Sequence, residues 1–185
     1  MENFLKQNLN SKFEISNDTE TEYNLSSLYS FTDNEFDIIQ DFKLIGDKKI
    51  NIVFVSTESK INDFDNSNIN SRGIQLWVVL TTNNDYEHTL LKNESLKDKI
   101  IDFFIKQDID FKEDKEFSKN FYIVSNNTET VESYFTEEMR QALLKFKDNN
   151  IIVEFKDNKI YVGTENNFQD DASLLNRIVD FFNVV

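Results

Sequence analysis

The stretch "EFDIIQDFKLIGDKKINIVFVSTE", residues 35–58, decides the fold because it reads as two strands joined by a tight turn. Gly46 lies in that turn, where glycine accepts positive φ without steric cost. Apolar residues occupy both faces of the second strand, which predicts a strand that is buried on one face and partly covered on the other. The next apolar run, "GIQLWVVLTT" at 73–82, predicts a central strand that ends at the polar "NND". Three strands with short connections indicate an antiparallel meander.

Helices and strands alternate in the second half of the chain. Apolar residues recur at helical spacing over 94–107, and "FYIVS" at 121–125 predicts a short strand. Residues 126–149 predict helix with a fresh start at Thr136, because the acids that follow it favour a first helical turn. A further helix is expected at the amino terminus, over residues 2–9.

The carboxyl-terminal part of the chain predicts a hairpin followed by a helix. "NIIVEFKDNKIYVGT", residues 150–164, places Asp157 and Asn158 between two apolar runs, as in a two-residue turn. "DDASLLNRIVDFFNVV", residues 170–185, is an amphipathic helix with acids at its start. The segment 59–73 is a loop by composition.

The order of these elements favours the α+β class. Strands gather early and helices late, so we expect an antiparallel sheet, made of the early meander plus the late hairpin, packed against amphipathic helices. No Pro-rich or Gly-rich linker lies near the midpoint. The sequence therefore predicts one domain over 1–185, with two closely packed halves, 1–92 and 93–185, as the alternative.

Composition restricts the classes of function. Hydrophobic residues make up 39 % of the chain and Phe occurs 18 times, which is too much apolar surface for a disordered chain. The net charge of −14 repels phosphate backbones, so no nucleic-acid partner is expected, whereas a basic protein would be attracted. There is no Cys, which removes disulfides, thiolate nucleophiles and zinc–sulfur sites.

Targeting and membrane signals are not found in the sequence. Met1–Lys6 do not form a basic segment followed by an apolar run, so no secretory signal is predicted. The apolar stretch Ile74–Leu80 is far shorter than a membrane span. We therefore predict a cytoplasmic protein without a membrane segment.

Two candidate sites carry some chemistry. His88 is the one histidine and would have to be the general base of any Ser or Thr nucleophile, but no G-x-S-x-G elbow is present, so we interpret it as structural. Asp63, Asp65, Ser67 and Asn68 have a spacing that resembles a calcium loop. The sixth and twelfth positions of that pattern require Gly and Glu but hold Asn68 and Ile74, so an ordinary exposed loop is favoured. No metal or cofactor is predicted, and cation binding by residues 63–68 is left open.

Paired carboxylates suggest acid–base work but have a simpler explanation. Glu137-Glu138 and Asp170-Asp171 both lie at expected helix starts, where acids stabilise exposed amides. With only three Gly residues, the chain holds no phosphate loop or dinucleotide-binding motif. No catalytic residue is therefore assigned.

The closing helix supplies the one candidate for a contact with a partner. Phe181 and Phe182 are adjacent, so apolar side chains lie on more than one face of this helix, and one of the two could point outward and form a partner or dimer patch. Trp77, by contrast, is predicted to be core. The oligomeric state is left open.

The charged stretch "DIDFKEDKEFSKNFYIV", residues 108–124, mixes acids, lysines and aromatics. The aromatic and aliphatic members are spaced as core anchors, at Phe111, Phe117, Phe121 and Ile123. The mixed charges of 112–115 suit an exposed turn, where each contributes little. We therefore interpret the stretch as structural.

A family resemblance rests on residues 108–146 and on "NIIVEFKDNKIYVGTENN" at 150–167. This region resembles an uncharacterised family of bacterial conserved hypothetical proteins, in which an "EFS" segment, a short strand and a "YFT" helix start follow in the same order. The resemblance implies a small α+β domain without established catalytic residues. Longer relatives carry predicted membrane segments and an Arg-rich character, whereas this chain has neither.

Three hypotheses of function follow from the sequence. The first is a non-enzymatic acidic protein-binding domain, in its most concrete version an immunity-type inhibitor that neutralises a basic toxin. The second is a metal-dependent hydrolase built on carboxylates, with Asp63, Asp65 and His88 as participants. The third is a structural envelope-associated domain, as the membrane-bearing relatives suggest.

Overall fold

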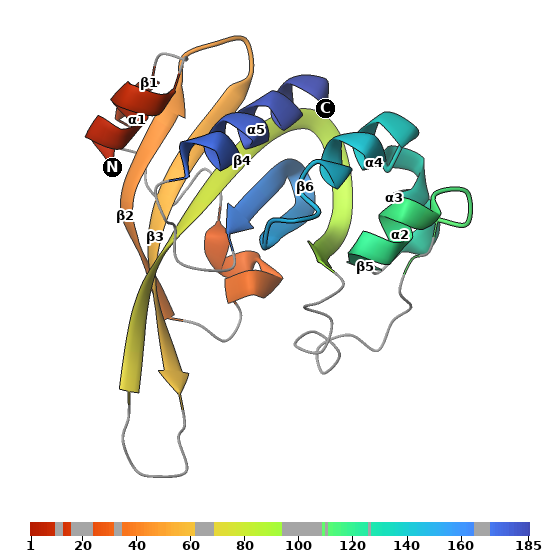
Figure 1. The fold of residues 1–185 in the computed structure, drawn as a ribbon, viewed down its shortest axis with the longest axis horizontal. Coiled ribbons are helices and arrows are strands. Elements are labelled where there is room, and N and C mark those ends of the chain that lie inside the picture. Colours follow the sequence, from red (N-terminus) through yellow and green to blue (C-terminus); the bar gives the residue numbers. More distant parts are fainter. Residues whose placement is uncertain are drawn as a thin grey trace.

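The long strand β4 (Ile69–Asn93) is the centre of a six-stranded antiparallel sheet (Figure 1). In this computed structural model the described residues are 1–9, 13–15, 24–31, 35–61, 69–93, 109, 111–125, 127–164 and 171–185, with the backbone alone described in 58–61 and 69–72. The predicted helix 94–107 and the loop residues 63–68 lie outside these ranges.

The predicted meander is confirmed. Strand β2 (Glu35–Leu44) pairs with β3 (Lys49–Ile61), and β3 pairs with the first half of β4 in continuous register from Lys49–Thr81 to Ile61–Ile69. The short strand β1 (Phe13–Ile15) adds to the outer edge of β2. Strands β3 and β4 are longer than expected, because both continue into the segment that composition alone marks as loop.

The prediction of a hairpin over residues 150–164 is wrong. Residues Ile151–Thr164 form one strand, β6, and both of its halves pair with β4 rather than with each other. Thr81 pairs with Lys159 and Thr89 pairs with Phe155, so eight steps along β4 match only four steps along β6. The four extra residues of β4 form a bulge. The polar "NND" therefore does not end a strand. It bulges at a corner where β4 and β6 bend together, and Asp157 adopts φ 52 there.

The strand β5 (Phe121–Ser125) completes the sheet, beside the second half of β4. Because β4 pairs with β3, β5 and β6, strands from both halves of the chain belong to one sheet. The prediction of the α+β class is confirmed by this antiparallel sheet and its helices.

Five α-helices occur among the described residues, and the starts of α4 and α5 follow the predicted capping signals. Thr136 accepts a hydrogen bond from the Met139 amide at the start of α4, and Asp171 accepts from Ser173 and Leu174 at the start of α5. The described α-helices are α1 (Glu2–Asn8), α2 (Lys115–Asn120), α3 (Thr128–Tyr134), α4 (Glu137–Leu144) and α5 (Ala172–Val184).

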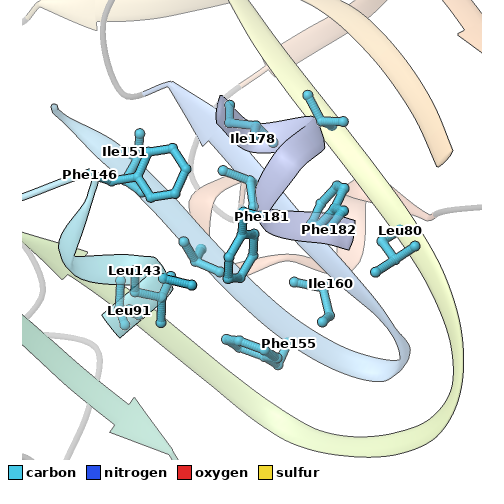
Figure 2. Packing of buried hydrophobic residues seen from close by; sticks show 14 of the residues in the cluster. Leu80, Leu91, Leu143, Phe146, Ile151, Phe155, Ile160, Ile178, Phe181 and Phe182 are labelled. Carbon is cyan, nitrogen blue, oxygen red and sulfur yellow. The ribbon is translucent and has the colours of Figure 1, made fainter. Parts of the chain in front are cut away.

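Hydrophobic side chains bury both faces of the sheet. One cluster joins alternate residues of β2, β3, β4 and β6 to the apolar sides of the helices, and α5 lies across it (Figure 2). On the other face, Trp77 and its sheet neighbours pack against two short 3₁₀ turns, Leu25–Ser27 and Tyr29–Phe31. The prediction that Trp77 is core is confirmed, since its side chain is completely buried.

Candidate functional site

The predicted partner contact at Phe181 and Phe182 is wrong. Both side chains are buried, at 3 % and 0 % exposure, and both point into the cluster formed with Phe146 and Ile178 (Figure 2). The physical reason is that α5 contacts both the sheet and α4, so adjacent positions on the helix each meet apolar neighbours. The exposed apolar residue of this helix is instead Val184.

The charged stretch 111–123 is mostly structural, as predicted. Phe111, Phe117, Phe121 and Ile123 are all buried, and Lys112 and Lys115 are exposed. Asp114 differs from the prediction of an exposed turn. Its carboxylate caps α2 by accepting from the Phe117 amide and lies 3.0 Å from Nε of the buried Arg140.

The other predicted site residues have simple positions. Glu137 and Glu138 are exposed in the first turn of α4, and a hydrogen bond from the Glu138 backbone amide, followed by one from Thr136, holds the pKa of Glu138 below its usual value. Asp171 caps α5. Asp63, Asp65 and Asp170 lie outside the described residues, and the described part of the chain contains no cluster of three metal-ligating side chains.

The most distinctive polar feature is Glu154, a carboxylate that is completely buried in the middle of β6. Its Oε2 accepts from the Tyr29 amide at 2.9 Å, and its Oε1 accepts from the Ser30 amide at 2.9 Å and from the Ser30 hydroxyl. A buried charge is tolerated only when it is well paired, and these donors supply that pairing. Glu154 thus connects the sheet to a segment 124 residues earlier in the chain.

His88 completes this site. Leu90 and Glu154 are opposite each other in the β4–β6 register, so the side chain of His88, two residues before Leu90, reaches the same face. Its Nε2 lies 3.0 Å from Glu154 Oε2. The imidazole stacks on the Tyr29 ring with centroids 3.6 Å apart and planes 9° from parallel, and 15 % of its side chain is exposed.

Residues 24–31, which we name the strap, cover this site from the opposite side of the sheet to α5. The strap is fixed by three buried apolar side chains, Leu25, Leu28 and Phe31. Lys156, two positions after Glu154, donates to the Ser27 carbonyl at 2.9 Å. Glu154 and Lys156, which lie two positions apart on the same face of β6, therefore hold the second and the first 3₁₀ turn of the strap, respectively.

A second polar network lies behind His88. The Thr89 hydroxyl is 2.7 Å from the Tyr134 hydroxyl and donates to Ser125 Oγ at 3.0 Å, and Ser125 Oγ donates in turn to the His88 carbonyl. Burial raises the pKa of Tyr134 to about 12, although the hydrogen bond with Thr89 opposes this shift. The network thus fixes the backbone that carries His88.

The arrangement at Glu154 fits two roles, one catalytic and one structural. A histidine whose Nε2 contacts a carboxylate is the orienting half of an acid–base system. A carboxylate that accepts from two successive backbone amides is an anchor for a turn. Among the described residues, three of the four hydrogen bonds at Glu154 come from the strap, so the contacts favour the anchor.

The special position of Glu154 has a local sign in the sequence. In "NIIVEF" it is the one charged residue in an apolar run, and a charge inside a buried strand must find partners. Tyr29 has no such sign, because its role depends on a contact with a residue far away in the sequence.

A separate acidic surface lies on α3 and α4. It consists of four exposed acids, and no basic residue lies between Asn127 and Met139. Glu129, Glu132 and Glu137 form no ion pair with any residue in the described ranges. The acidic surface is defined by Glu129, Glu132, Glu137 and Glu138.

Comparisons with protein-family models, with curated proteins and with solved structures give no match for this chain. The resemblance to a family of bacterial conserved hypothetical proteins therefore stays a prediction. In the described part of the chain, no helix has both the length and the apolar character to cross a membrane.

Proposed function

We propose that this chain is a non-enzymatic protein-binding domain whose acidic surface docks a basic protein in the cytoplasm. The observation that carries the proposal is the acidic surface on α3 and α4, where four carboxylates are exposed and the sequence from Asn127 to Met139 contains no Lys or Arg. By contrast, the exposed Glu116 of α2 pairs with Lys147 at 3.1 Å.

The rigidity of the supporting elements favours a docking role. Helix α4 begins at its Thr136 cap and buries Met139, Ala142 and Leu143 in the core, so its acidic first turn has a fixed position. Helix α3 is held to β4 through Tyr134, which contacts Thr89. A preorganised charged surface costs little conformational entropy on binding.

The net charge of −14 adds a long-range contribution. Complementary charge accelerates the encounter with a partner more than it tightens the final complex. An inhibitor of the immunity type must capture a basic toxin quickly, and this requirement fits the charge. We infer that version as the most concrete form of the proposal.

The test is a binding experiment with matched charge reversals. The chain is used to capture proteins from its native host at low and at high salt, and the variant Glu129→Lys/Glu132→Lys is compared with Glu14→Lys/Asp180→Lys. Both variants change the net charge equally, but Glu14 and Asp180 are exposed on β1 and α5. A basic protein that binds wild type and the control, is lost at high salt and fails to bind the first variant supports the proposal.

Two results count against it. Equal loss in both variants indicates an effect of net charge without a docking surface, and recovery of no protein at either salt concentration contradicts a binding role.

The hydrolase alternative depends on His88, whose contact with Glu154 resembles an acid–base pair. A thermal-shift measurement with calcium, magnesium and manganese separates this alternative from docking. A large stabilisation that Asp63→Ala abolishes favours a metal-dependent enzyme.

A further inference from the structure

The strap, residues 24–31, is joined to the sheet by a polar contact at Glu154 that includes the imidazole of His88. We propose that the contact between His88 and Glu154 is a pH-sensitive latch, which fastens the strap more tightly when the imidazole is protonated. This inference concerns a different part of the molecule from the proposed docking surface and does not depend on it.

The strap and His88 share one acceptor atom, Oε2 of Glu154. Glu154 Oε2 accepts from the Tyr29 amide at 2.9 Å and lies 3.0 Å from His88 Nε2, so one carboxylate oxygen meets both the strap and the histidine. The Tyr29 ring also stacks on the imidazole at 3.6 Å. Any change in the charge of His88 is therefore felt at both of its contacts with the strap.

Protonation acts on the two contacts in the same direction. The Glu154 side chain is completely buried, and a carboxylate without a compensating charge is costly in such a position. An imidazolium compensates this charge, and it also interacts favourably with the aromatic face of Tyr29. A neutral imidazole still donates one hydrogen bond to Glu154 but leaves the negative charge in place, so the latch is weaker at higher pH.

His88 is the side chain near Glu154 that can compensate the charge of the carboxylate. Within the described ranges, His88 is the one basic side chain with a nitrogen within 4.0 Å of the Glu154 carboxylate. On β6, Lys156 is engaged by the Ser27 carbonyl, and the pKa of Tyr161 is raised well above its usual value by burial, so Tyr161 stays neutral.

Two further titratable groups lie close to His88. On β4, Glu87 precedes it, and on α3, Tyr134 stays neutral because burial raises its pKa to about 12. The described strap itself contains no charged side chain. Imidazole generally changes its charge between about pH 5 and 8, where these two tyrosines stay neutral because burial raises their pKa values.

The chain contains its own reporters of strap opening. The amides of Tyr29 and Ser30 donate directly to Glu154, so their hydrogen exchange measures the opening of the latch. Trp77, the one tryptophan, has its ring centroid 5.0 Å from that of Phe31 in the strap. Its fluorescence is expected to shift to longer wavelength when the strap lifts.

The experiment compares wild type with His88→Gln at about pH 6 and pH 8, by amide exchange and Trp77 fluorescence. Exchange rates are divided by the intrinsic rate at each pH. In wild type we expect roughly fivefold stronger protection of Tyr29 and Ser30 at the lower pH, the difference between a charged and a neutral hydrogen-bond partner. His88→Gln keeps a donor but cannot titrate, so its protection is expected to be independent of pH.

Buried strand amides such as that of Val53 serve as the control for global stability. A pH response of Tyr29 and Ser30 that Val53 does not share supports the latch, and the wild-type measurement alone gives this result even when the variant does not fold. Absence of the response in wild type, an equal response at Val53, or an unchanged response in His88→Gln overturns the inference.

Discussion

Gly163 in β6 lies directly beneath the indole of Trp77 in β4, its partner in the strand register. A Cβ atom at position 163 would lie 2.5 Å from Trp77 Cε2. Both residues are buried, and Phe31 of the strap packs against the indole. The absence of a side chain at 163 is thus what allows the large aromatic ring to lie at the sheet surface under the strap.

The first prediction concerns this contact. Gly163→Ala is expected to destabilise the protein by about 1–3 kcal/mol, because the Trp77 ring must shift in a closely packed core. Chemical denaturation followed by Trp77 fluorescence measures the loss. Gly46→Ala is the control, since no atom lies within 4 Å of its added Cβ and the position is exposed. An equal effect of the two substitutions would contradict the packing argument.

The comparison between the expected and the observed strands indicates what kind of information the sequence holds. Gly46 and the apolar residues of β3 are local signals, and they correctly predict the meander, although Gly46 itself does not adopt a positive φ. Asp157 is also a local turn signal, but the turn it forms bends β6 along β4 instead of reversing it. A turn residue fixes local φ and ψ, whereas the pairing partner of Asp157 is Tyr86, about 70 residues away in the sequence.

The candidate site follows the same division. The caps Thr136 and Asp171 are correctly predicted, because capping involves residues two or three positions apart. The contacts of Glu154 with Tyr29 and His88 join three distant segments, and no local pattern specifies them. The burial of both Phe181 and Phe182 is non-local in the same sense, since it depends on what covers each face of α5.

The second prediction tests the aromatic core beneath the charged stretch. Phe117 is completely buried, with ring centroids of Phe111 and Phe121 at 5.6 and 5.3 Å. Phe117→Ala is therefore expected to cost about 3–5 kcal/mol of unfolding free energy. Lys112→Ala, at an exposed position of the same stretch, is expected to change it by less than about 0.5 kcal/mol. Unchanged melting of Phe117→Ala would refute the assignment.

The third prediction concerns the buried ion pair of Arg140 and Asp114. Arg140 donates from Nε to Asp114 at 3.0 Å and from a terminal nitrogen to the Phe135 carbonyl at 2.7 Å, and its guanidinium lies 4.8 Å from the centre of the Phe111 ring. Arg140→Met leaves the Asp114 charge without its partner, so we expect a loss of about 3–5 kcal/mol.

A double-mutant cycle separates the ion pair from simple packing. Asp114→Asn keeps an oxygen that can cap α2 but removes the charge, so the double variant Arg140→Met/Asp114→Asn is expected to lose less stability than the two single variants together. Denaturant unfolding of all four proteins measures the coupling. Strict additivity of the two losses would show that the charges do not interact.

The fourth prediction uses the pH dependence of a helix cap. Asp171 accepts from the amides of Ser173 and Leu174 at 2.9 and 3.1 Å. The bond from the Leu174 amide is the largest of the effects that hold the pKa of Asp171 below its usual value. The folded state therefore favours the ionised carboxylate, and this contribution is complete above the ordinary carboxyl pKa and is lost as the pH falls through the folded value.

Two substitutions separate the contribution of the hydrogen bonds of Asp171 to stability from the contribution of its charge. Asp171→Ala removes both and is expected to cost about 1 kcal/mol at neutral pH. Asp171→Asn keeps the acceptor oxygen, so it is expected to cost less at neutral pH and to lose less stability than wild type when the pH falls from about 5 to 3, since its amide does not titrate. Thermal unfolding at several pH values measures both differences. If wild type and Asp171→Asn respond identically to acid, the charge of Asp171 does not stabilise α5, and the effect of Asp171→Ala is due to the lost hydrogen bonds alone.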